Sequence, residues 1–274
     1  MASTIKTLLL DIEGTICPIA FVKDVLYPYA YQTVLSKVPT LQQYFPLTPA
    51  TSSSDPNDND LLSYLKKFPS EVTSSPDTLI AHISSLIERD IKDTALKSLQ
   101  GYLWKFGYES GEIKAPLFAD VVPAIKKYSK ELENGVSIYS SGSVPAQILL
   151  FKYVLNNDDP VAAALDINPY LTSYFDTVNA GPKTVTKSYT SIAEQLKLQP
   201  KDILFLSDNA LEIDAALAAG FQAYLTVRPG NAPVSEALIT EKNYKVITTL
   251  ENLLVKKKRN KKKKNFVRLQ RTNM

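Results

Sequence analysis

The stretch that most constrains the fold runs from Leu8 to Thr15 and reads LLLDIEGT. Its apolar run ends in the carboxylate of Asp11, Glu13 follows two positions later, and Gly14 comes directly after. An apolar run this short, bounded by glycine, is typical of a buried strand in a parallel sheet. Functional loops of open α/β sheets leave the carboxyl ends of strands, and alternate residues of an extended chain share a face. We therefore expect both acids at one strand end, where they need a cation or a shared proton.

Strands and helices alternate in the second half of the chain, after Pro116. The sequence predicts helices over 121–133, 144–155, 184–198 and 210–219 and strands over 135–139, 174–178, 203–206 and 222–227. Alternating β and α units indicate an α/β fold with a doubly wound parallel sheet.

The segment from residue 20 to residue 115 shows no strand pattern. The sequence predicts a helix over 21–37 that Pro28 kinks or divides, a polar loop over 48–60, and helices over 60–67 and 76–106. A helical block between two strands indicates an inserted helical subdomain.

Polar side chains follow each of the three strongest strands, and their chemistry suits phosphoryl transfer. These residues are Asp11 and Glu13, Ser140 and Ser141, and Asp208, with Lys183 at the start of a helix between the last two sets. In a parallel sheet these groups meet at one edge. Phosphoryl transfer needs a cation held by carboxylate oxygens, donors for the phosphoryl oxygens and an in-line nucleophile. Oxygen ligands without a Cys/His cluster favour Mg²⁺ over zinc.

This order of motifs resembles the haloacid dehalogenase (HAD) superfamily, and a finer match points to one family within it. The matching runs lie between Leu8 and Ala232 and read DIEGTICPIAFVKDVLYPYA, LQGYLW, FADVVPA, IYSSGSVPAQ, GPK, ILFLSD and VRPGNA. Together they resemble the acireductone synthases, the enolase-phosphatases of methionine salvage. Glu13 is the informative position, because most phosphatases of the superfamily have Asp there.

The resemblance implies a HAD-like Rossmannoid core formed by residues 1–19 and 116–255, with a helical cap of residues 20–115 over the site. It implies one Mg²⁺ per subunit and a monomer. The substrate would be 2,3-diketo-5-methylthiopentyl 1-phosphate, which is enolised and then dephosphorylated to the acireductone 1,2-dihydroxy-3-keto-5-methylthiopentene.

The resemblance also assigns roles to the site residues. Asp11 would bind Mg²⁺ and attack phosphorus, while Glu13 would bind the metal through its main-chain oxygen and leave its side chain for proton transfer. Asp208 would be the third metal ligand, supported by Glu212 one helical turn later.

Ser140 and Ser141 would bind the phosphate, and Lys183 would neutralise its charge. The enolisation base is either Glu13 or a residue of the cap. Phe21, Tyr27 and Trp104 are candidates to enclose the methylthio tail, although aromatic residues are more often part of a hydrophobic core.

Charge is unevenly distributed along the 274 residues. The last 19 residues, 256–274, hold ten of the 31 Lys and Arg and none of the 28 acids, so the rest of the chain has a net charge of −7. Such a basic tail is typical of a solubilising extension, a nuclear localisation signal or a contact with nucleic acid or acidic lipid.

Other features point to a cytoplasmic location, with nuclear entry as the alternative that the tail raises. Cys17 is the only cysteine, which excludes an intrachain disulfide, and no apolar run approaches the roughly 20 residues of a membrane span. Two other functions stay open at this point: a generic Mg²⁺-dependent sugar-phosphate phosphatase, and a non-catalytic protein that binds nucleic acid through its tail. The acidic body argues against the second.

Overall fold

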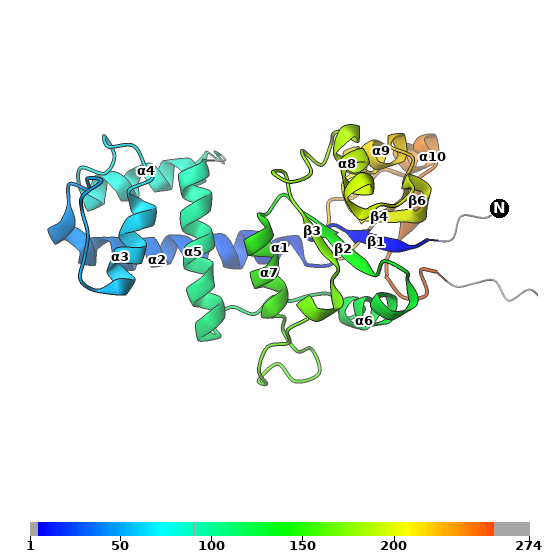
Figure 1. Ribbon diagram of the computed structural model, residues 1–274, viewed down its shortest axis with the longest axis horizontal. Coiled ribbons are helices and arrows are strands. Elements are labelled where there is room, and N and C mark those ends of the chain that lie inside the picture. Colours follow the sequence, from blue (N-terminus) through cyan, green and yellow to red (C-terminus); the bar gives the residue numbers. More distant parts are fainter. Residues whose placement is uncertain (1–4, 90, 92, 255–274) are drawn as a thin grey trace, which may run out of the picture.

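A parallel sheet forms the centre of the molecule, as the computed structural model shows for residues 5–89, 91 and 93–254 (Figure 1). The sheet has six strands in the order β3-β2-β1-β4-β5-β6, and every neighbouring pair is parallel. The strands are β1 (Thr7–Leu10), β2 (Val136–Tyr139), β3 (Ser173–Phe175), β4 (Ile203–Ser207), β5 (Gln222–Thr226) and β6 (Lys245–Ile247). This order confirms the predicted doubly wound α/β fold, in which ligands bind where the strand order reverses, beside β1.

Alternate residues of the central strands pack on opposite faces of the sheet. Leu8 and Leu10 of β1 belong to a cluster that includes residues of α6 (Val121–Glu131) and α7 (Val144–Lys152). Leu9 belongs to the cluster on the other face, with residues of α8 (Thr186–Leu196) and α9 (Ala210–Ala218). Because both faces are covered, β1 is apolar from Leu8 to Leu10, and the first polar side chain of the site comes where the strand ends.

The elements from α1 to α5, between β1 and α6, form a helical block beyond the carboxyl ends of the strands (Figure 1). Its elements are α1 (Ile19–Phe21), a π-helical turn (Val22–Leu26), α2 (Tyr27–Lys37), a 3₁₀ helix (Val38–Tyr44), α3 (Pro56–Leu65), α4 (Pro76–Glu88) and α5 (Thr94–Ser110). The described residues from 20 to 114 form no strand. The block has a hydrophobic cluster of its own, which includes Leu62, Leu79 and Leu99.

Two predicted boundaries in this block are wrong. The predicted helix 76–106 is two helices, because the carboxylate of Asp93 accepts a hydrogen bond from the Leu96 N–H and starts α5 anew. The predicted loop 48–60 ends early, because Asp55 caps α3 and Pro56 occupies its first turn. Pro28 lies at the start of α2, directly after the π-helical turn, so the chain continues there as an irregular helix.

Two described elements after β5, α10 (Glu236–Lys242) and β6, were not predicted from the sequence. Within the described residues, no helix is both long and apolar enough to cross a membrane. The basic tail 256–274 lies outside the described residues.

Candidate active site

Asp11 begins the loop that leaves β1, and this loop is tightly folded. The Asp11 N–H donates to the Leu206 carbonyl of β4 at 2.9 Å, and the Asp11 carboxylate accepts from the Ile12 N–H at 2.7 Å. The side chain is therefore fixed at the strand end, with 5% of the residue exposed.

Gly14 is required in this loop for two reasons. Its φ angle of +69° lies in the left-handed region, which favours glycine. A Cβ atom at this position would lie 2.2 Å from Oδ2 of Asp208, so the carboxylate of Asp208 lies directly over the glycine. The glycine thus allows the loops after β1 and β4 to approach each other.

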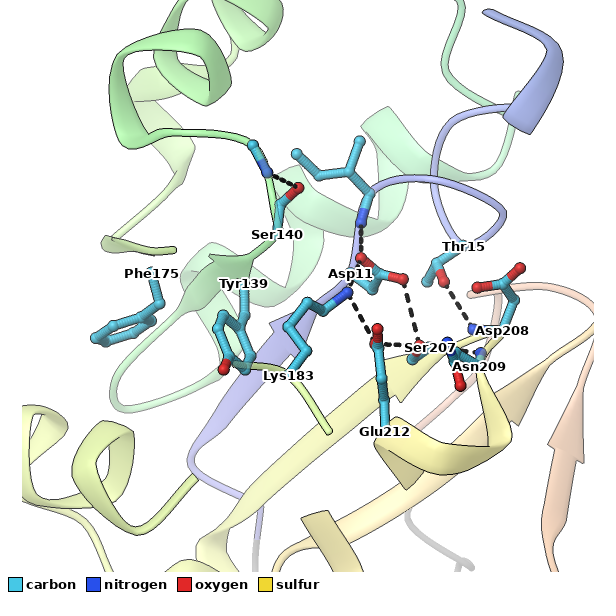
Figure 2. A network of polar contacts seen from close by, with 12 residues as sticks. Asp11, Thr15, Tyr139, Ser140, Phe175, Lys183, Ser207, Asp208, Asn209 and Glu212 are labelled. Atoms are coloured by element: carbon cyan, nitrogen blue, oxygen red, sulfur yellow. Dashed lines mark hydrogen bonds and ion pairs between the residues drawn. The ribbon is translucent and has the colours of Figure 1, made fainter. Parts of the chain in front are cut away.

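Lys183 is the buried cation of the site, and Figure 2 shows it between two carboxylates. Its Nζ lies 2.5 Å from Oδ1 of Asp11 and 2.8 Å from Oε2 of Glu212. Burial alone would lower the pKa of Lys183, but the charges of Asp11 and Glu212 outweigh burial and raise it. The Lys183 side chain therefore stays positively charged at neutral pH. The Tyr189 hydroxyl donates a hydrogen bond to the main-chain carbonyl of Lys183 at 2.6 Å.

The end of β4, the short loop after it and the first turn of α9 bring Ser207, Asp208 and Glu212 to the same place (Figure 2). The Ser207 hydroxyl lies 2.7 Å from Oε2 of Glu212 and 3.2 Å from Oδ2 of Asp11. The Asp208 N–H donates to Oγ1 of Thr15 at 3.1 Å. Glu212, with 7% of the residue exposed, is thus buried beside Lys183 although its position on a helix also allowed a solvated side chain.

Ser140 and Ser141 follow β2, on the other side of Asp11. The Ser140 hydroxyl is buried and accepts from the Gly142 N–H at 3.2 Å, whereas Ser141 is exposed. Ser143 occupies the N-cap position of α7, but its side chain makes no capping hydrogen bond. The carboxylate of Asp176 accepts from the Val144 N–H instead, at 3.0 Å.

The electrostatics of the site fit a divalent cation. Burial, then the charges of Asp11 and Glu212, raise the pKa of Asp208 to about 7. Burial and the charge of Asp11 also raise the pKa of Glu212. The part of each shift that comes from neighbouring carboxylates is negative charge that Lys183 does not offset, and a divalent cation bound by Asp11 and Asp208 would offset it.

The carboxylates alone do not form a metal cage. Among the described residues, no three His, Cys, Asp or Glu side chains are arranged to hold a metal ion together. The ligand set expected for Mg²⁺ uses only two side chains, those of Asp11 and Asp208, with the main-chain oxygen of Glu13 as the third protein ligand.

Two adjoining cavities share the residues Glu13, Ser140 and Ser141. The polar cavity has a volume of about 230 Å³ and is lined by Asp11, Glu13, Ile19, Ser140, Ser141, Lys183, Asp208, Asn209 and Glu212. All seven site residues predicted from the sequence thus line one cavity.

The second cavity, of about 330 Å³, lies between the helical block and the loop after β2. Its lining includes Leu26, Tyr27, Gly101 and Trp104 from the block. The Trp104 indole N–H donates to the Leu26 carbonyl at 2.7 Å, which fixes the ring. Phe21 is not part of this lining: it is buried in the hydrophobic cluster that includes Leu8 and Leu10 of β1, the core position that aromatic residues more often take.

Sequence reasoning missed several residues that support the site. The Thr15 hydroxyl accepts a hydrogen bond from the Asp208 N–H, and the Ser207 hydroxyl donates one to the Asp11 carboxylate. Arg228 and Asn231 belong to the VRPGNA run, which was noted without a role, and both donate to the loop after β1.

Comparison with known proteins places these observations in a family. The model of the haloacid dehalogenase-like hydrolases matches residues 5–220. A protein of Pyricularia oryzae described as enolase-phosphatase E1 is 48% identical over 92% of this chain and 100% of its own length. A Yarrowia lipolytica protein with the same description is 47% identical over 88% of this chain and 96% of its own length.

A solved structure is also closely similar. The UTR4 protein of Saccharomyces cerevisiae is 42% identical, with a TM-score of 0.74 over 90% of this chain and 99% of that protein. The chain therefore belongs to the haloacid dehalogenase-like hydrolases and, within them, to the enolase-phosphatase E1 family.

Proposed function

We propose that this protein is an Mg²⁺-dependent enolase-phosphatase, an acireductone synthase of methionine salvage. Its substrate is 2,3-diketo-5-methylthiopentyl 1-phosphate, and its products are the acireductone and phosphate. The observation that carries the proposal is the pair of adjoining cavities: one is polar and holds Lys183 among carboxylates, and the other is lined jointly by the helical block and by the loop after β2 with α7. A phosphate suits the first cavity and an apolar methylthio tail suits the second.

Asp11, Asp208 and the main-chain oxygen of Glu13 would hold one Mg²⁺. The ion supplies charge neutralisation for the phosphoryl oxygens when it is bound. Support for this assignment comes from the excess of buried negative charge around Asp208.

Dephosphorylation then follows from the side chains of the chain itself. A carboxylate oxygen of Asp11 forms a bond to phosphorus while the bond from phosphorus to the substrate oxygen breaks, which gives an aspartyl-phosphate; the departing oxygen takes a proton from the Glu13 carboxyl and leaves as the enol. Water then hydrolyses the aspartyl-phosphate. Lys183 and Ser140 offset charge and donate to the phosphoryl oxygens, because both line the same cavity as Asp11.

Enolisation needs a base beside the carbon next to the phosphate ester. Glu13 lines both cavities, so this residue lies at the junction where that carbon would lie. Lys97 of α5 lines the second cavity and is the amine that the helical block contributes there, beside the phenols of Tyr27 and Tyr108. Glu13 and Lys97 are both candidates for the base.

The same proposal divides the chain into a core of residues 1–19 and 116–255 and a cap of residues 20–115, with the tail 256–274 outside both. The separate hydrophobic cluster of the helical block supports this division. A sugar phosphate would place hydroxyl groups against apolar side chains such as Leu26 and Trp104, so the second cavity disfavours a generic sugar-phosphate phosphatase. The alternative function, binding of nucleic acid, rests only on the basic tail 256–274, which lies outside the described residues.

Gly101 offers a test of the second cavity. A Cβ atom at Gly101 has no neighbour within 4 Å, and the glycine lines the cavity. We expect Gly101→Leu to fill the cavity and to lower kcat/KM for the diketo phosphate by about 10- to 100-fold, the value of an apolar group in a pocket. For a short phosphate ester without the tail, kcat/KM should stay within about twofold of the wild type.

The matched control is Gly101→Ala, which leaves the cavity open and favours α5 by about 1 kcal/mol. Its kinetics with both substrates should match the wild type. An equal loss for both substrates in Gly101→Leu would contradict the assignment of this cavity to the tail.

A further inference from the structure

Arg228 follows β5 and is buried, with 6% of the residue exposed, yet it does not line either cavity of the site. Its guanidinium makes a bidentate ion pair with the carboxylate of Asp120, with both N–O distances at 3.0 Å. Its Nε donates to the Thr15 carbonyl at 2.9 Å, and its Nη1 also donates to the Thr248 carbonyl at 2.9 Å. A buried arginine with its donors used in this way fixes the groups around it.

The carboxylate of Asp120 accepts further hydrogen bonds besides those from Arg228. Its Oδ2 also accepts from the Leu250 N–H at 2.6 Å and from the Thr249 hydroxyl at 3.1 Å. Burial alone would raise the pKa of Asp120, but the hydrogen bonds and charge of Arg228, with the Leu250 N–H, hold it below its usual value. The pair is therefore charged at neutral pH and has little freedom to move.

The two partners of Arg228 belong to the two segments that join the helical block to the sheet. Thr15 lies on the segment that leaves β1 toward α1, and Asp120 lies on the segment that returns from α5 and begins α6. The two segments also contact each other directly, because the Phe118 N–H donates to the Ile16 carbonyl at 3.1 Å. The Phe118 ring lies 4.8 Å from the guanidinium carbon of Arg228. Arg228 thus binds both connections at one point.

From this point a short chain of contacts reaches the reacting groups. The Thr15 carbonyl accepts from Arg228, and the Thr15 hydroxyl accepts from the Asp208 N–H at 3.1 Å. Asn231, three residues after Arg228, donates to the Gly14 carbonyl at 2.8 Å, and Gly14 lies under the Asp208 carboxylate. The turn after β5 therefore fixes the loop on which Asp208 rests.

We propose that Arg228 and Asp120 are positioning residues for catalysis: they fix both connections of the helical block and hold the loop 13–17, which sets the place of Asp208. The inference uses the proposed function only for its assay. Failure of the wild type to release phosphate would contradict the proposed function, whereas the ratio of variant to wild type tests Arg228.

Arg228→Lys tests this role because it keeps one positive charge beside Asp120 but loses the planar set of donors. We expect kcat to fall by about 10- to 100-fold, since a shift of about 1 Å in a reacting group has that effect. KM should change by less than about threefold, because the cavities keep their lining. The dissociation constant for Mg²⁺, measured by calorimetry without substrate, should rise by about tenfold, since Asp208 is displaced.

A second variant, Thr15→Val, keeps every contact of the Arg228 guanidinium and removes only the acceptor for the Asp208 N–H. It should change kcat and the Mg²⁺ dissociation constant in the same direction as Arg228→Lys. The control is Leu62→Ala, a fully buried residue of the helical cluster whose loss lowers the melting temperature without touching the loop.

The inference would be overturned if Arg228→Lys lowered the melting temperature as Leu62→Ala does but kept the wild-type kcat and Mg²⁺ affinity. If Arg228→Lys does not fold, the same result with Thr15→Val would overturn it. That result would make the pair a purely structural ion pair.

Discussion

Asp11→Asn is expected to lower phosphate release by about 10⁴-fold or more, because a neutral amide is a poor nucleophile and a poor metal ligand. The fold should survive, since an Asn oxygen can still accept the Ile12 N–H that holds this side chain at 2.7 Å. Stability in the absence of metal should not fall, because the substitution removes one of the crowded carboxylates around Asp208. A single-turnover assay of phosphate release, together with a melting curve, measures both effects.

The matched control for Asp11→Asn is Asp214→Asn on α9. Asp214 is paired with Lys242 at 3.0 Å and lies outside both cavities, so the same chemical change there should leave phosphate release unchanged. Wild-type phosphate release by Asp11→Asn would refute the assignment of the nucleophile.

Lys183→Met should be the most destabilising single change in the site and should also lower phosphate release by about 10²- to 10³-fold. The lysine is buried between Asp11 and Glu212 at 2.5 and 2.8 Å, so its loss leaves two buried carboxylates without their cation. Removing one partner of a buried ion pair costs about 3–5 kcal/mol of unfolding free energy. The exposed pair Lys242–Asp214 gives the control: Lys242→Met should cost at most about 1 kcal/mol.

The destabilisation of Lys183→Met should depend on pH. Burial already raises the pKa of Asp208 to about 7 and raises that of Glu212, and loss of the ammonium raises both further. When folding raises the pKa of a carboxyl group, the protonated group contributes to stability at pH values below its pKa in the unfolded chain, which is about 4. This contribution is lost as the pH rises through the pKa of the group in the folded protein. Urea unfolding without metal should therefore show a small difference from the wild type at pH 5 and a large one at pH 8. An equal difference in unfolding free energy at both pH values would mean that the pKa values of the neighbouring carboxyl groups do not depend on Lys183.

The sheet and the groups at its edge could be predicted because their signals are local. Each central strand is an apolar run that ends in polar residues, as in Leu8–Asp11 and Ile203–Asp208. Parallel pairing then brings such ends together without further information. The structure places Asp11, Lys183 and Asp208 in one cavity for this reason.

Supporting contacts could not be predicted in this way, because they join residues far apart in the sequence. Arg228 contacts Thr15 across 213 positions and Asp120 across 108, and no local pattern records such a pair. The start of α7 illustrates the same point: Ser143 directly precedes the helix predicted over 144–155, but Asp176 of a different loop supplies the capping oxygen. Asp55 and Asp93 are both residues that favour the N-cap position of a helix. The polar run around Asp55 nevertheless predicted a loop, and the apolar spacing on both sides of Asp93 predicted one continuous helix.

In the proposed reaction, one active site first enolises a diketone and then removes its phosphate. The most direct test adds the purified protein, with Mg²⁺, to 2,3-diketo-5-methylthiopentyl 1-phosphate and follows enol absorbance and free phosphate in the same stopped-flow experiment. We predict that the enol absorbance rises before phosphate appears. Phosphate release without an enol intermediate would contradict the account and would favour a simple phosphatase on the same fold.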